Sequence, residues 1–95
     1  MNKNNAIKIL NNKNDKKVVE VTMLPKQYLK KHSHDWALDI IILAGSIQVR
    51  ANSKSTILNS GERYKLDNGV IHTERSGFQG VSFLSSRPIS QEEKK

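Results

Sequence analysis

The sequence predicts an all-β domain, an antiparallel sandwich or barrel. Stretches of alternating apolar and polar residues, or of β-branched residues, recur about every eight to twelve positions between Gly, Asn, Ser and Asp turns. No segment of ten or more residues has the 3.6-residue periodicity of an amphipathic helix. The 95 residues suit one domain. A chain this short buries a limited share of its surface, which favours a closed barrel or an oligomer.

The first clear strand is expected at 18–24, where apolar and polar residues alternate until Pro25 ends the run. A second alternating stretch is 27–32. The apolar run 38–43 indicates a buried strand, because it is short and β-branched. The remaining strands are expected at 47–51, 55–58, 63–66, 70–74 and 81–85, with turns at 44–46, 52–54, 59–61, 67–69 and 76–77. Asn68-Gly69 is the strongest turn signal, since this pair readily adopts positive φ angles.

Two polar extensions are expected to flank the β domain, which spans 18–86. Residues 1–17 form an Asn/Lys-rich leader, and its short apolar patch, 6–10, is interpreted as an edge strand before a loop at 11–17. An edge strand of this kind is a candidate for exchange between two copies, so a homodimer is expected. Residues 87–95 are interpreted as a short, flexible, solvated tail.

The net charge of +7 is concentrated near the amino terminus. Residues 1–31 carry eight lysines and two acidic residues, whereas residues 32–95 are nearly balanced at +1. The basic stretch has one aromatic residue, Tyr28, and no recognition-helix pattern, so nucleic acid is not an expected partner. Absence of cysteine excludes a disulfide framework and a thiolate metal site. No apolar run is long enough to span a bilayer, and no signal peptide is recognised, so a soluble, cytoplasmic protein is expected.

The three histidines form the candidate site. His32 and His34 are two residues apart, which places both side chains on one face of an extended strand. Two neutral imidazoles side by side suit a divalent transition metal, and His72 from another strand would nearly complete the site. The sequence has no serine-nucleophile motif, no paired catalytic carboxylates and no phosphate-binding loop, so metal chemistry is the remaining catalytic option.

The spacing around these histidines resembles the two motifs of the cupin superfamily, small β-barrels of the jelly-roll type. The second motif matches as Gly61, five residues, Asp67-Asn68-Gly69, two residues and His72, with Ser76 at the usual Asn position. The first matches through His32, His34 and Gly45, although Lys26 takes the place of its leading Gly. The resemblance implies an antiparallel double-stranded β-helix, a jelly-roll or cupin barrel.

The first motif lacks its usual glutamate. The ungapped count from Gly45 places Leu38 there, and a count with one more residue after His34 places Asp39 there. Neighbouring positions of a strand face opposite ways, so the two alternatives exclude each other. Some cupins without this glutamate bind iron through three histidines. The resemblance therefore implies a three-histidine site of His32, His34 and His72, with Fe(II) favoured over zinc, manganese and nickel.

Other residues have two interpretations. Trp36 either lines the mouth of the pocket or packs in the barrel core, and Glu74, on the same face as His72, is either a ligand or proton acceptor or part of a rim salt bridge. Arg50, Arg63 and Arg75 are interpreted as solvated outer-face residues, with contact to an anionic substrate as the alternative.

Three functions remain open at this point. The first is a metal-dependent dioxygenase or isomerase acting on a small molecule. The second is a non-catalytic cupin that binds or senses a small ligand in the same pocket. The third is a basic interaction protein whose metal site is vestigial. The fold does not choose among them, because function resides in the contents of the pocket.

Overall fold

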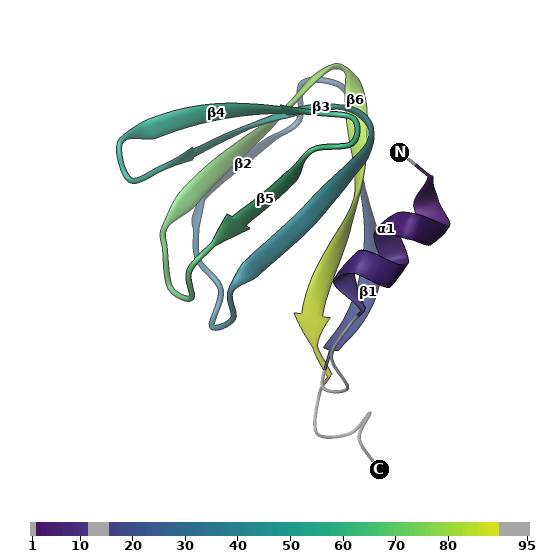
Figure 1. The fold of residues 1–95 in the computed structure, drawn as a ribbon. Helices are drawn as coiled ribbons and strands as arrows, with labels where there is room; N and C mark the ends of the chain where they lie inside the picture. Colours follow the sequence, from purple (N-terminus) through teal and green to yellow (C-terminus); the bar gives the residue numbers. More distant parts are fainter. Residues whose placement is uncertain (1, 12–15, 90–95) are drawn as a thin grey trace.

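The structure, a computed structural model, describes residues 2–11 and 16–89. The remaining parts of the leader, the 11–17 loop and the tail lie outside the described residues. One helix and six strands follow one another (Figure 1): α1 (Lys3–Leu10), β1 (Lys16–Met23), β2 (Tyr28–His32), β3 (Leu38–Ala51), β4 (Lys54–Asn59), β5 (Arg63–Leu66) and β6 (His72–Pro88). The predicted all-β class is confirmed, with one short helix added.

The two long strands, β3 and β6, organise the sheet. They pair with each other in antiparallel fashion, and every other strand pairs with one of them. The outer side of β6 pairs first with β2 and then with β1, and the outer side of β3 pairs first with β5 and then with β4. The fold therefore has two halves that share β3 and β6. The hydrogen-bonded order runs β1-β6-β3-β4 without closing, so the expected closed barrel is wrong in this detail.

We name the two halves by what they carry. The helix half contains β1, β5, and the β3 and β6 segments 38–44 and 81–88. The histidine half contains β2, β4, and the β3 and β6 segments 46–51 and 72–76.

The chain passes between the halves at two glycines, one in each long strand. Gly45 in β3 has φ +77° and lies within register shifts of the β3–β6 pairing, as in a β-bulge. Gly80 in β6 has φ +76°. The expected turns at 44–46 and 76–77 are wrong, because both stretches lie inside continuous strands, β3 and β6, and the chain does not reverse there. A Cβ on Gly45 would stand 2.1 Å from the Gly80 carbonyl oxygen, so the close approach of β3 to β6 requires glycine.

The main core lies between the two halves. It consists of buried apolar side chains from four strands, β1, β3, β4 and β6, namely Met23, Leu38, Ile40, Ile42, Ile47, Val49, Leu58, Val81 and Phe83. In β3 the alternation places Ile47, Val49 and Ala51 inside and leaves Gln48 and Arg50 on the outer face. The inward-facing side chains of this part of β3 therefore point into the main core.

The expected edge strand at 6–10 is wrong, because these residues belong to α1. Asn2 caps the helix by accepting hydrogen bonds from the Asn4 and Asn5 backbone N–H groups. Ala6 and Leu10, one turn apart, are buried against Ile41 and Leu84 on the outer side of the helix half. The apolar patch is therefore used within the chain and is not a strand for exchange between copies.

Both expected extensions are shorter than predicted. Lys16 and Lys17 belong to β1, and Arg87 and Pro88 belong to β6. Lys16 pairs with Pro88, and Lys17 pairs with Arg87. Among the described residues, no helix is long and apolar enough to cross a membrane.

Candidate metal centre

The three predicted histidines come together where β2 ends and β6 begins. His32 is the last residue of β2 and His72 the first of β6, and the pairing register sets them opposite each other. His34 lies beyond the end of β2, so the two histidines do not share one strand as the sequence predicted. The ring centroids are 5.2 Å apart for His32 and His34, 4.3 Å for His32 and His72, and 5.5 Å for His34 and His72. One ring nitrogen of each lies within 4.8 Å of the other two.

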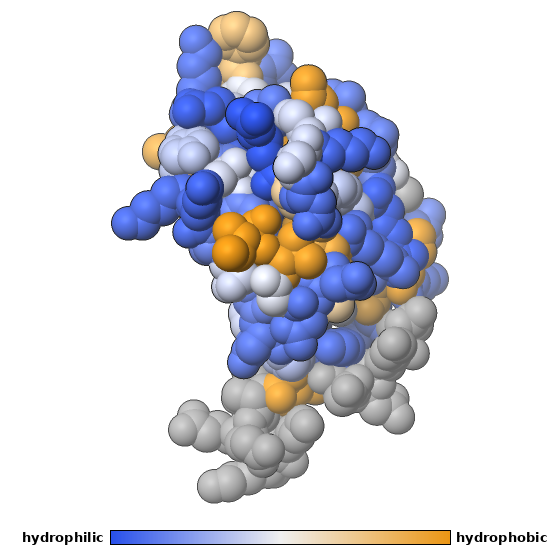
Figure 2. Space-filling model, turned by 90° about the vertical axis from the view of Figure 1, so that its left-hand side faces the viewer, coloured by the Kyte–Doolittle hydropathy of each residue, from blue (hydrophilic) through white to orange (hydrophobic). Residues whose placement is uncertain are grey.

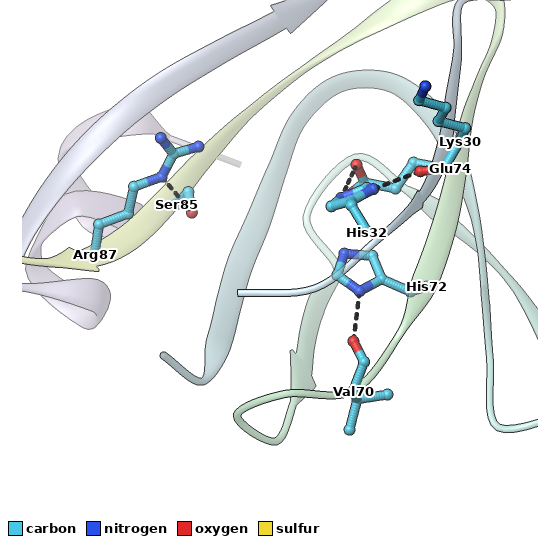
Figure 3. Close-up of polar contacts among 7 residues, drawn as sticks. All are labelled: Lys30, His32, Val70, His72, Glu74, Ser85 and Arg87. Atoms are coloured by element: carbon cyan, nitrogen blue, oxygen red, sulfur yellow. Dashed lines mark hydrogen bonds and ion pairs between the residues drawn. The ribbon is translucent and has the colours of Figure 1, made fainter. Parts of the chain in front are cut away.

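Backbone carbonyls fix the orientation of two of the rings (Figure 3). His32 Nδ1 donates to the Lys30 carbonyl over 2.7 Å, and His72 Nδ1 donates to the Val70 carbonyl over 3.0 Å. A carbonyl oxygen can only accept, so each Nδ1 carries the proton and each Nε2 of the neutral ring keeps a free lone pair. Such a hydrogen bond is the usual outer support of a metal-bound histidine. His72 Nε2 is buried and has no hydrogen-bond partner among the described residues.

The Asp67-Asn68-Gly69 turn positions the other side of the site. Gly69 has φ +82°, and its N–H donates to the His34 carbonyl over 2.9 Å. The same turn then leads into Val70, whose carbonyl holds the His72 ring. The predicted turn is confirmed. Its spacing before His72 has a structural reason, because Gly69 bonds to the backbone of His34 and Val70 bonds to the ring of His72.

Electrostatics favour neutral imidazole at His34. Its pKa is lowered from 6.5, first by burial and then by repulsion from His32, His72 and Arg87, while Asp35 opposes the shift. Arg87 itself lies apart from the cluster, where its Nε donates to Ser85 Oγ over 3.5 Å (Figure 3). A histidine that resists protonation is available as a metal ligand at neutral pH.

Glu74 is buried beside this cluster. It is 5% exposed, and its Oε2 lies 3.6 Å from His32 Nε2. It comes from β6, two residues after His72, and points to the same interior (Figure 3). The expected rim salt bridge with a lysine or arginine is wrong, because the carboxylate faces the interior and its neighbour there is His32, a candidate ligand.

Trp36 belongs to the site and not to the core. Its indole stacks on His34 with ring centroids 4.6 Å apart and an angle of 24° between the planes. The Trp36 Nε1 atom is buried without a hydrogen-bond partner among the described residues. Trp36 therefore packs against a candidate ligand and is not among the residues of the main core.

The missing glutamate of the first motif is explained by the strand register. Leu38 is buried in the main core, whereas Asp39 points outward and accepts two hydrogen bonds from the Arg63 guanidinium over 2.9 and 2.8 Å. This carboxylate also raises the pKa of Arg63. Within the described part of the chain, Asp39 is not in the group that could hold a metal, so β3 offers no carboxylate to it.

The fold and the histidine cluster together define a class, the small double-stranded β-helix protein with three grouped imidazoles. Comparison with solved structures identifies the fold as that of the cupins. A cupin-2 domain-containing protein from Shewanella frigidimarina aligns with a TM-score of 0.70 at 22% identity, over 81% of this chain and 74% of that protein. The resemblance drawn from the motifs is thereby confirmed at the level of fold.

Two further structures agree. A conserved protein with a double-stranded β-helix domain from Klebsiella pneumoniae aligns with a TM-score of 0.64 at 25% identity, over 78% of this chain and 67% of that protein. The polyketide cyclase RemF from Streptomyces resistomycificus aligns with a TM-score of 0.70 at 22% identity, over 79% of this chain and 55% of the cyclase. No protein-family model and no curated protein matches the sequence.

Proposed function

We propose that the protein is a small metal-binding cupin that holds one divalent cation through His32, His34 and His72. The observation that carries this proposal is the buried His72 Nε2, which has no partner among the described residues and lies among the other two imidazoles. An unsatisfied buried polar atom costs about 1–3 kcal/mol, and a cation would remove that cost. Imidazole suits iron, zinc and nickel; Fe(II) is our first choice, with zinc, nickel and manganese as alternatives.

Glu74 supplies the negative charge that β3 lacks in this proposal. Its Oε2 lies 3.6 Å from His32 Nε2, the nitrogen left free by the hydrogen bond from His32 Nδ1 to Lys30. A carboxylate beside three neutral ligands offsets part of the charge of a cation. Glu74 therefore takes the role of a fourth ligand or of a counter-charge beside the cation.

Metal binding is tested on protein purified without a histidine tag. We expect about one equivalent of a transition metal in the purified protein by mass spectrometry, and none in His72→Ala. Competition with a chromophoric chelator should show that Glu74→Gln binds the metal about 10- to 100-fold more weakly than the unmodified protein, the usual range for a carboxylate beside the ligands. Glu20→Gln is the control, because Glu20 is an exposed glutamate that pairs with Lys3 on the helix half. The absence of metal binding in the unmodified chain, after reloading with Fe(II) or zinc, would exclude the proposal.

A second candidate, catalysis on a small molecule, is favoured by the structural likeness to a polyketide cyclase. A divalent metal here would act as a Lewis acid and leave coordination positions open to a ligand. Trp36 would line that position and donate from its unpartnered Nε1 to an oxygen of the substrate. Oxygen consumption and product formation with thiols, diketones and aromatic acids are the assay. Bound metal without turnover, together with ligand-induced thermal stabilisation, would favour a sensing function over an enzyme.

The homodimer remains a proposal, but the strand edge that would join the two copies is that of β4 and not residues 6–10. Residues 6–10 are buried within the chain, whereas β4 pairs on one side only, with β3. An unpaired strand edge can extend a sheet into a second copy. Light scattering after gel filtration checks this, and Thr56→Pro is the variant to compare, because proline removes a backbone donor from β4.

A further inference from the structure

The outer face of the histidine half is uncovered, in contrast to that of the helix half, which α1 covers. One row across its four strands contains Tyr28, Arg75, Gln48 and Ile57, which the pairing registers set side by side. Viewed from the side where β4 lies in Figure 1, the surface is mainly hydrophilic, with an apolar patch near its centre (Figure 2). We call the uncovered surface the outer face.

Two adjoining hollows cross the outer face. The larger, of about 590 Å³, is bounded by Lys31, Arg50 and Lys54. The smaller, of about 310 Å³, is bounded by Lys26, Ile57 and Phe78. Gln48 and Arg75 line both hollows, so the two form one continuous groove across the strands.

The groove is strongly cationic. Five basic side chains line it, and no carboxylate from the described part of the chain does: Lys26, Lys31, Arg50, Lys54 and Arg75. Among the described residues, Lys31, Arg50, Lys54 and Arg75 have no ion pair with an acidic residue. Unneutralised like charges repel one another, and an anion in the groove would remove that repulsion. Lys26 and Lys31 come from the basic stretch 1–31, and the fold gathers them with Arg50 of β3 and Arg75 of β6 on one face.

Each hollow also contains an exposed aromatic ring with a cation above it. The Arg75 guanidinium lies 4.7 Å from the Tyr28 ring centroid, and Lys26 Nζ lies 4.5 Å from the Phe78 ring centroid. Tyr28 is 50% exposed and Phe78 is 82% exposed. The sequence does not show this pattern, because Tyr28 and Phe78 belong to different strands, β2 and β6, which only the fold brings together.

We infer that the outer face binds single-stranded nucleic acid. A repeated pair of aromatic ring and cation in adjoining hollows matches a polymer that repeats a flat base and a phosphate. Bases stack on exposed aromatic rings or on an arginine plane, and the cations contact the backbone. A small anion would leave the second hollow unused. If a second copy of the chain bound through the same face, the five cations of one groove would face the five cations of the other and repel them.

The first measurement is fluorescence anisotropy with labelled single-stranded RNA and DNA of about twelve nucleotides, within the usual range of site sizes. Phe78→Ala should weaken binding by about tenfold without changing the salt dependence, because it removes stacking and no charge. The substitution is safe for the fold, since the side chain is 82% exposed.

Charge is tested by Arg50→Gln with Arg75→Gln. The slope of log K against log salt should fall by about 1.4 for two lost phosphate contacts on a single strand. The control is Lys8→Gln with Lys65→Gln, which removes the same charge from exposed positions on α1 and β5. The control pair should bind nearly as well as the unmodified protein.

Several results would overturn the inference. They are no binding at low salt, an equal loss in the control pair, or a Phe78→Ala variant that binds unchanged. Tighter binding of an acidic peptide than of the oligonucleotide would assign the groove to a protein partner. A dimer that Phe78→Ala dissociates would assign it to a second copy. Because none of these variants alters a histidine, failure here leaves the metal proposal unaffected.

Discussion

Replacing Gly45 with alanine should be one of the most damaging single changes in this chain. Its φ of +77° disfavours any residue with a Cβ, at a cost of about 1–2 kcal/mol. The added Cβ would also stand 2.1 Å from the Gly80 carbonyl oxygen and 3.0 Å from the Gly80 carbonyl carbon and Val81 Cα. These are backbone atoms, so β3 and β6 must separate, and overpacking of this kind costs about 1–3 kcal/mol. The expected total is about 2–5 kcal/mol.

Gly61→Ala is the matched control. Gly61 has φ +89°, but a Cβ there would meet nothing within 4 Å, so only the conformational cost of about 1–2 kcal/mol applies. Urea unfolding followed by far-UV circular dichroism gives both free energies, with equal m-values expected. Equal losses for the two variants would refute the argument that the crossing of β3 and β6 needs a bare backbone at Gly45.

Three further outcomes are expected. Asp39→Asn should lower the unfolding free energy by at most about 1 kcal/mol, because its pair with Arg63 is partly exposed, and should leave metal affinity unchanged in a chelator titration. Leu10→Ala should cost about 2–5 kcal/mol in urea unfolding, since Leu10 is 2% exposed; a loss below 1 kcal/mol would mean that α1 is not docked. The metal-free protein should lose stability as pH falls through and below 6.5, since the lowered pKa of His34 makes the unfolded chain bind more protons there. His34→Gln should flatten that part of the pH profile of the melting temperature.

The sequence predicted the strands well where the pattern was local. The run 63–66 is β5 with the same bounds, and the turns at 52–54 and 67–69 are where positive φ angles occur, at Asn52, Ser53 and Gly69. It failed at 44–46 and 76–77, because a glycine that ends a strand and one that lies inside a strand have the same local signature. Only the pairing of β3 with β6 along their whole length distinguishes the two.

The site shows a similar division. Motif spacing predicted that three histidines would meet, which the structure bears out in their ring geometry. It did not predict that Glu74 would face His32, because that contact depends on the register between β2 and β6. The helix was missed for a different reason: with only eight residues, its apolar positions Ala6, Ile7 and Leu10 span a single repeat, and tertiary burial against Ile41 stabilises it.

The sharing of β3 and β6 by both halves has a thermodynamic consequence. Neither half can form its sheet without β3 and β6, which both halves share. We therefore expect the described chain to unfold in a single cooperative transition. Any ion taken up by the histidines would then protect amide hydrogens in α1 from exchange, although the helix contacts none of the ligands. At a free concentration one hundred times its dissociation constant, a ligand adds about 2.7 kcal/mol to the stability of the whole unit. Exchange rates in the helix would thus report occupancy of the histidine site.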